Sequence, residues 1–228
     1  MPTKRSYASQ GDACATAHAM ELVGDRWTYP VVRELMLGPK RFAELENALL
    51  GITPAVLTAR LRQMESAGLV RRGVRERTKV YELTDWARDL RPVLEDLGRW
   101  AMQSPIRSTE GGLTPDAAVQ SMLTVAPRRR MSPPIEVALH LRDDRADATT
   151  YSYRLHWAAA LTIERSPARQ PQATVVADSS TWADVVHNSR DLSAVDVRGD
   201  VTVVRRILDV IQADYPHTSE TPPRADDK

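Results

Sequence analysis

Residues 42–83 read FAELENALLGITPAVLTARLRQMESAGLVRRGVRERTKVYEL, which predicts a helix, a tight turn at Gly51 and a second helix. The second helix should begin at Thr53-Pro54, because a threonine hydroxyl caps a helix N-terminus and proline suits the first helical position. Gly68 should end it. The apolar residues that share one face of this helix at the helical period are Leu57, Leu61 and Met64.

A basic hairpin should follow the second helix. Residues 69–72 and 80–83 read as short strands, joined by a basic loop at residues 73–79. Residues 53–79 carry seven cationic and two anionic side chains, a local net charge of +5, whereas the whole chain has +1. Helix, turn, helix and hairpin predict a winged helix-turn-helix, which places its second helix in the major groove and its cations near phosphate. A solvated, salt-bridged surface hairpin is the alternative.

The face of the second helix opposite its apolar stripe should meet the DNA. Arg62 and Gln63 can hydrogen-bond base edges, whereas Ala55 and the methyl group of Thr58 can meet thymine methyls. Cations in the hairpin should follow the minor groove or backbone, and two cations just before the first helix should clamp a phosphate. The predicted DNA contacts are Lys40, Arg41, Thr53, Ala55, Thr58, Arg60, Arg62, Gln63, Arg75, Arg77 and Lys79.

Three more helices flank this stretch, at residues 15–23, 25–37 and 86–102. Trp27 in the second of them is expected to anchor the core. Pro92 in the last predicts a kink or a displaced start. The last helix has more apolar residues than one small domain needs, which predicts a dimer seam, with packing against its own domain as the alternative. These residues are Leu90, Val93, Leu94, Leu97, Trp100 and Ala101.

Length and composition fit a globular protein with two modest domains. The chain has 228 residues, of which 42% are hydrophobic and 27% charged. No apolar run approaches the roughly 20 residues that span a bilayer, and the first 14 residues do not resemble a secretory signal. We therefore expect a cytoplasmic protein with no membrane partner. The single cysteine excludes an intrachain disulfide.

The second half of the chain has a different pattern. After a helix at residues 116–125 and an arginine triplet at residues 128–130, apolar residues alternate over 136–141 and 151–157, with further strands at 161–163 and near 175–177. Two helices complete an α+β domain with an antiparallel sheet. The triplet could contact phosphate or form a solvated loop. The predicted organisation is 1–103 winged-helix DNA-binding and dimerisation domain, 104–112 linker, 113–216 α+β domain and 217–228 disordered tail.

The first hundred residues carry ELVGDRWT (residues 21–28), GPKRF (residues 38–42) and YELT (residues 81–84), with Cys14 near the start. On these stretches, residues 10–103 resemble the HxlR family of bacterial winged-helix transcriptional regulators. The resemblance implies a homodimer that binds double-stranded operator DNA, with the terminal helices of the domain forming much of the dimer contact. The wing departs from the family's frequent acidic, proline-containing form, so operator preference is not carried over.

The second half carries Ala177-Asp178 followed by Thr181-Trp182, and Gly199-Asp200 before an apolar helix. On these residues it is similar to a sterol carrier protein type two-like domain, an α+β fold that encloses an apolar cavity. The resemblance implies a small apolar or aromatic ligand. The candidate cavity residues are Tyr151, Tyr153, Trp157 and Trp182, with ordinary core packing as the alternative for each.

Cys14 and the absence of catalytic motifs limit the further functions that the sequence allows. Relatives in the HxlR family use thiol chemistry, so Cys14 is a candidate redox sensor. The alternative is a small packed side chain, since only His18 offers a neighbouring cation. We find no dinucleotide-binding glycine motif, phosphate-binding loop, nucleophile elbow or paired-cysteine metal site. The sequence therefore predicts a non-enzyme with no cofactor and no metal.

The sequence as a whole predicts a dimeric, sequence-specific transcriptional regulator, with repression as the expected mode. Its fold should be multi-domain: an α-rich winged helix-turn-helix, then an α+β domain with an apolar cavity that senses a small ligand. In one alternative, the second domain is a protein-interaction module that fixes dimer geometry without a ligand. In another, the protein is a thiol-based sensor through Cys14.

Overall fold

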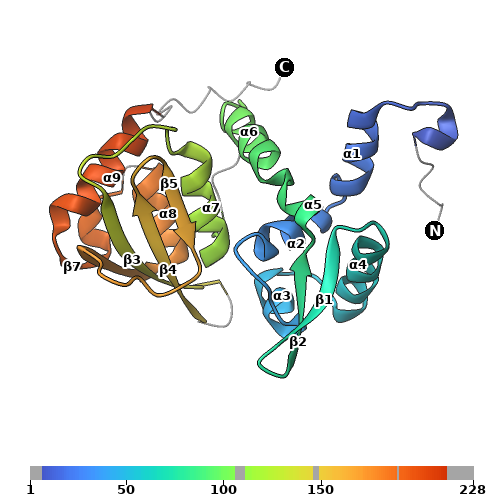
Figure 1. The fold of residues 1–228 in the computed structure, drawn as a ribbon, viewed down its shortest axis with the longest axis horizontal. Helices are drawn as coiled ribbons and strands as arrows, with labels where there is room; N and C mark the ends of the chain where they lie inside the picture. The colour runs from blue at the N-terminus through green and yellow to red at the C-terminus, as the bar shows by residue number, and fades with distance from the viewer. Residues whose placement is uncertain (1–6, 106–110, 146–148, 189, 215–228) are drawn as a thin grey trace, which may run out of the picture. The chain divides into compact units, whose positions relative to one another are not determined.

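The structure is a computed structural model that describes residues 7–105, 111–145, 149–188 and 190–214. The chain divides into two compact units, Met1–Arg91 and Pro92–Lys228 (Figure 1). The domain boundaries given by the sequence remain a prediction. The predicted linker lies partly outside the described residues, and the predicted disordered tail lies wholly outside them. No helix in the described parts of the chain is both long and apolar enough to cross a membrane.

The N-terminal unit is rich in α-helix and ends in a two-stranded wing and a short helix. Its elements in order are η1 (Ala8–Gln10), α1 (Ala15–Val23), α2 (Thr28–Leu35), α3 (Phe42–Ala48), α4 (Pro54–Ser66), β1 (Val70–Arg75), β2 (Thr78–Leu83) and α5 (Asp85–Arg88), followed by α6 (Leu90–Met102), which runs into the second unit. The first predicted helix, residues 15–23, is confirmed. The core is formed by Val31, Val32, Leu35, Leu45, Leu49, Leu57, Leu61, Met64, Leu69, Val80 and Leu83.

The helix-turn-helix forms for the reasons read from the sequence. The Thr53 side chain accepts a hydrogen bond from the Val56 N–H at 3.4 Å, and Pro54 occupies the first turn of α4. Gly68 ends the helix with φ of +73°, a conformation that strains other residues. Leu57, Leu61 and Met64 are buried. The prediction for this helix is confirmed.

The wing is longer and tighter than predicted. β1 and β2 pair antiparallel from Val70 opposite Leu83 to Arg75 opposite Thr78, so only Glu76 and Arg77 form the turn. The predicted loop over residues 73–79 was therefore wrong. Both turn residues have positive φ, 47° and 67°, which is the geometry that suits a two-residue hairpin. The usual Asn-Gly signal is missing here, so the sequence did not reveal the turn.

Two helix boundaries also differ from prediction. α2 begins at Thr28 and not at Asp25, because the Asp25 carboxylate accepts a hydrogen bond from the Trp27 N–H at 2.9 Å and holds these residues in a turn. The long helix over residues 86–102 is divided into α5 and α6. The displaced start that Pro92 predicted is confirmed: the proline lies in the first turn of α6, where its missing N–H has no helical partner to lose.

The described residues of the second unit form a five-stranded sheet, three α-helices after α6 and a short 3-10 helix. Its elements after α6 are α7 (Pro115–Val125), β3 (Ile135–Arg142), β4 (Thr150–Trp157), β5 (Leu161–Glu164), β6 (Ala173–Asp178), α8 (Ser179–His187), η2 (Leu192–Ala194), β7 (Asp196–Gly199) and α9 (Val201–Asp214). The strand order is β5-β4-β3-β6-β7. β3, β4 and β5 alternate between buried and more exposed residues, and α7, α8 and α9 supply the apolar side chains of the same core. The predicted α+β class is confirmed for this unit.

The predicted antiparallel sheet was wrong in one pairing. β6 lies beside β3 and parallel to it, with Val137 opposite Ala173, while the other neighbouring strands are antiparallel. β7 was not predicted at all. Short connections between successive strands favour antiparallel neighbours, but residues 165–172 carry the chain from β5 past two strands, β4 and β3, to β6. Alternation within each strand carries no information about this crossover.

Glu136 on β3 fixes the crossover segment. Its carboxylate accepts hydrogen bonds from the Arg169 and Gln170 N–H groups at 2.9 and 3.0 Å, and from the Arg154 guanidinium at 2.9 Å. The hydrogen bonds from Arg154 and Gln170 lower the pKa of Glu136 to about 2. This carboxylate therefore stays charged, and keeps the segment attached, well into acidic solution.

Candidate nucleic-acid interface

The outward face of α4 carries the groups that can read bases. Ala55, Ala59, Arg62 and Gln63 are exposed, and Thr58 is half-buried, while the opposite side of the helix is packed into the core. Arg62 has no carboxylate within ion-pair distance in the described residues. A guanidinium and an amide on one exposed helical face can form the bidentate hydrogen bonds that distinguish guanine and adenine in a major groove.

Arg60 on the same helix has an internal partner. Its guanidinium lies 2.6 Å from the Asp25 carboxylate, and its Nε atom is buried with no acceptor among the described residues. The ion pair links α4 to the turn between α1 and α2. Arg60 is thus placed to orient the helix, and its predicted contact with DNA remains a prediction. Asp25 was missed as a positioning residue; the sequence holds no signal that joins it to a cation 35 positions away.

The wing presents two kinds of cation. Arg71 and Arg75 lie 2.9 and 3.6 Å from the carboxylate of Glu82, which is largely buried. Arg72 pairs with Glu65 at 2.9 Å. Arg77 at the turn and Lys79 on β2 are exposed, and neither has an ion-pair partner in the described part of the chain. These two are the wing cations best placed to bind phosphate without first breaking an internal pair.

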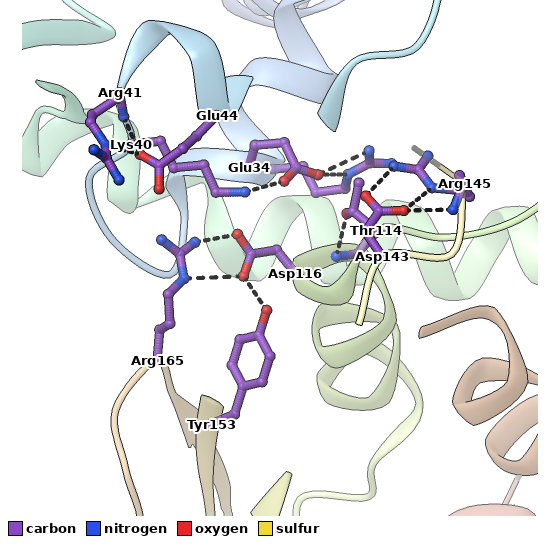
Figure 2. Close-up of polar contacts among 12 residues, drawn as sticks. Glu34, Lys40, Arg41, Glu44, Thr114, Asp116, Asp143, Arg145, Tyr153 and Arg165 are labelled. Carbon is purple, nitrogen blue, oxygen red and sulfur yellow. Dashed lines mark hydrogen bonds and ion pairs between the residues drawn. The ribbon is translucent and has the colours of Figure 1, made fainter. Parts of the chain in front are cut away.

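Lys40 does not lie where the sequence placed it. We predicted a phosphate clamp, but the side chain is 2% exposed and its ammonium is 2.5 Å from the buried Glu34 carboxylate (Figure 2). Its backbone pairs with Tyr81, whose N–H donates to the Lys40 carbonyl at 2.8 Å, so Lys40 fixes the edge of the wing. Because a buried, paired ammonium cannot reach phosphate, this prediction was wrong.

Arg41 is exposed, as predicted. Its Nε donates to Glu44 at 3.2 Å, and the same carboxylate accepts a hydrogen bond from the Arg41 N–H, which closes the start of α3 (Figure 2). Its charge remains open to solvent beside a helix N-terminus. Thr53, also predicted to contact DNA, is exposed and caps α4.

The helices on either side of the helix-turn-helix and wing, α1 and α6, leave apolar side chains exposed. No residue of α1 is buried, and Met20 is exposed. On α6, Val93, Leu97 and Trp100 recur at helical spacing and remain exposed, Trp100 at 74%. Trp27 is half-buried under the Arg26 guanidinium, 5.1 Å from its ring, and so is a weaker core anchor than expected.

Cys14 lies exposed at the N-terminus of α1. Hydrogen bonds from the backbone N–H groups of Ala17 and Thr16 lower the pKa of the thiol from its ordinary value of 9.0. The alternative of a small packed side chain is therefore wrong. The cause of the shift is the helix terminus rather than His18, which pairs with Glu21 at 3.7 Å.

Three of the four candidate cavity residues are core residues. Tyr153, Trp157 and Trp182 are essentially unexposed, and their polar atoms have partners within the unit: Asp116 Oδ1, the Arg129 carbonyl and the Met122 sulfur. Tyr151 is half-buried, with the Arg165 guanidinium 5.3 Å from its ring. This arrangement matches ordinary core packing, and a ligand site there remains a prediction.

The described residues contain no group of three or more histidine, cysteine, aspartate or glutamate side chains that could hold a metal ion. The buried polar groups of the second unit instead bind one another. Asp116 accepts a hydrogen bond from Tyr153 at 2.7 Å and pairs with Arg165 (Figure 2).

Comparisons with known proteins bear on the first half of the chain. A family model for an HxlR-like helix-turn-helix matches residues 22–108. The uncharacterized HTH-type transcriptional regulator YvaP of Bacillus subtilis (strain 168) is 36% identical over 88 residues, 37% of this chain and 82% of YvaP. The HTH-type transcriptional regulator YodB of the same organism is 35% identical over 88 residues, 37% of this chain and 79% of YodB. The solved structure of quinone-bound YodB is 32% identical, covers 39% of this chain and 97% of that chain, and has a TM-score of 0.36.

Proposed function

Because the chain belongs to the HxlR-like helix-turn-helix family, we propose that it regulates transcription by reading an operator with the exposed face of α4 and the β1–β2 wing. The observation that carries the proposal is Arg62. It is exposed on α4, lies opposite the buried stripe and has no ion-pair partner in the described residues. Arg77 and Lys79 would bind the phosphate backbone of the DNA without regard to its sequence.

Replacing Arg62 with alanine should weaken operator binding by roughly 1–3 kcal/mol and relax the preference at one base pair, as the loss of a bidentate contact does. The measurement is a titration of operators selected from random duplexes, with each base pair then varied. Arg77→Ala is the matched control, because it should weaken all sequences alike and reduce the salt dependence. Unchanged affinity and base preference in the Arg62 variant would contradict the assignment.

We propose that the protein acts as a homodimer. The exposed apolar residues of α1 and α6, above all Trp100, support this, because several large apolar side chains exposed along one helix are typical of a protein–protein contact surface. A dimer would set two copies of α4 about 34 Å apart, one turn of duplex. Sedimentation that gives a monomer both free and on operator DNA would contradict the proposal.

We propose a regulatory role for the second unit, through a small apolar or aromatic ligand. Resemblance to sterol-carrier domains supports the idea, and half-buried Tyr151 is the aromatic residue that a ligand could reach first. Operator affinity measured against a panel of apolar metabolites tests it. If no compound changes affinity, the alternative of a protein-interaction module gains support. We also propose that the protein is not an enzyme and works in the cytoplasm.

The exposure and lowered pKa of Cys14 favour a second candidate function, thiol-based sensing. Hydrogen peroxide would convert the thiolate to a sulfenic acid and release hydroxide, placing a new polar group at the start of α1. We expect peroxide to weaken operator binding by the wild-type chain and to leave Cys14→Ser unaffected. Because the pKa is lowered, alkylation of Cys14 should remain fast at a lower pH than alkylation of a free thiol. Equal responses of both chains to peroxide would rule out this function.

A further inference from the structure

The loop between α7 and β3 carries an arginine triplet that the proposed reader does not use. Arg128, Arg129 and Arg130 are all exposed. Arg128 lies 3.9 Å from Glu95, at the limit of an ion pair. Neither Arg129 nor Arg130 has an ion-pair partner among the residues that the structure describes.

The backbone of this loop is fixed to the core. The buried indole of Trp157 donates a hydrogen bond to the Arg129 carbonyl at 2.9 Å, and the N–H of buried Met131 donates to the Ala158 carbonyl at 2.8 Å. Arg206 on α9 donates to the Ser132 carbonyl. The three guanidiniums therefore project from a preformed backbone, so little loop entropy is lost when they bind.

The charge of the loop contrasts with its surroundings. Residues 106–228 carry 15 basic and 17 acidic side chains, a net charge of −2. Most other arginines described there hold a carboxylate: the pairs are Arg142 with Asp178, Arg145 with Asp143, Arg154 with Glu136, Arg165 with Asp116, Arg190 with Asp184 and Arg198 with Asp196. The triplet thus gathers three exposed guanidiniums in one short loop, whereas the arginines of these six pairs are each neutralised by a carboxylate.

We propose that Arg128–Arg130 form a second, sequence-independent contact with the phosphate backbone of duplex DNA. Guanidiniums match phosphate oxygens in geometry and charge. Residues 127–134, all of them described, expose no large apolar side chain of the kind that anchors a protein partner. The inference rests on the proposed function, because DNA is the polyanion that the winged helix is proposed to bind.

The test uses the full chain and a 40-base-pair duplex of mixed sequence, titrated between roughly 50 and 200 mM salt. Each phosphate contact contributes about 0.9 to the slope of log affinity against log salt, so Arg129→Ala with Arg130→Ala should reduce the slope by about 1.8. Charge reversal, Arg129→Glu with Arg130→Glu, should reduce affinity further. Both substitutions keep the backbone hydrogen bonds of the loop, and thermal melting checks that each variant is folded.

The matched control is Arg142→Ala with Arg190→Ala. It removes the same two charges from exposed arginines that already hold carboxylates, and the slope should then change by much less. An unchanged slope in the Arg129 and Arg130 variants, or an equal change in the control, overturns the inference. Loss of binding to phosphatidylglycerol vesicles with the DNA slope intact also overturns it, in favour of a membrane contact. Failure of the wild-type chain to bind any duplex contradicts the proposed function instead.

Discussion

Replacing Lys40 with alanine should destabilise the winged helix by about 3–5 kcal/mol, the cost of removing one member of a buried ion pair. Lys40 and Glu34 are 2% and 0% exposed, and their charged atoms are 2.5 Å apart. Arg33 also reaches Glu34, at 3.2 Å, and is itself only partly exposed, so it cannot fully replace the lost ammonium. Urea unfolding, with hydrogen exchange resolved over α2 and the wing, measures the loss.

Arg41→Ala is the control for this experiment. It removes a neighbouring but exposed cation, so stability should change by less than about 0.5 kcal/mol. Its effect should appear instead in DNA binding, as a smaller salt slope. If Lys40→Ala kept full stability and lost DNA affinity, the result would support the prediction from the sequence that Lys40 binds phosphate.

Replacing Asp116 with alanine should cost the second unit a similar amount, about 3–5 kcal/mol. Asp116 is 0% exposed, pairs with Arg165 and accepts the Tyr153 hydroxyl at 2.7 Å. The variant removes the acceptor of a buried hydroxyl and the carboxylate that pairs with a guanidinium only 16% exposed. Hydrogen exchange of the β3 and β4 amides is the readout, because it separates this unit from the winged helix.

Glu164→Ala is the matched carboxylate control for Asp116. Its side chain is 65% exposed and lies 3.9 Å from Arg154, so its removal should change stability by under about 1 kcal/mol. An Asp116 variant as stable as this control would show that the buried cluster contributes little. If the Asp116 variant lost exchange protection in the wing and not in the sheet, Asp116 would stabilise the winged helix, which would contradict this prediction.

The N-terminal fold could be predicted largely because its signals are local. Thr53-Pro54 starts α4, Gly68 ends it, and the apolar stripe on α4 identifies its buried side. Each signal acts within a few residues along the chain. The hairpin of the wing was predicted, but the length of its strands was not, because the exposed strands carry charges in place of alternation and because Glu76 and Arg77 adopt a turn geometry that usually requires asparagine or glycine.

The errors at the site come from contacts between residues distant in sequence. Lysine is rarely buried without a partner, and Lys40 is buried because Glu34 on α2 supplies one. The ion pair of Arg60 with Asp25 and the pairing of β6 with β3 likewise join residues that are about 35 positions apart in the sequence. Periodicity identifies which side of an element is apolar, but it does not say which distant group neutralises a charge.

The parallel pairing of β3 with β6 also affects how the protein is made. The wing joins strands that are consecutive in the chain. Val137 on β3, in contrast, can pair with Ala173 on β6 only after the two intervening strands have been synthesised. Closing long loops costs entropy before any contact repays it, so such sheets form slowly. Synthesis proceeds from the N-terminus, and domains fold as they emerge. A nascent chain on the ribosome can therefore complete its winged helix before the second unit has been synthesised.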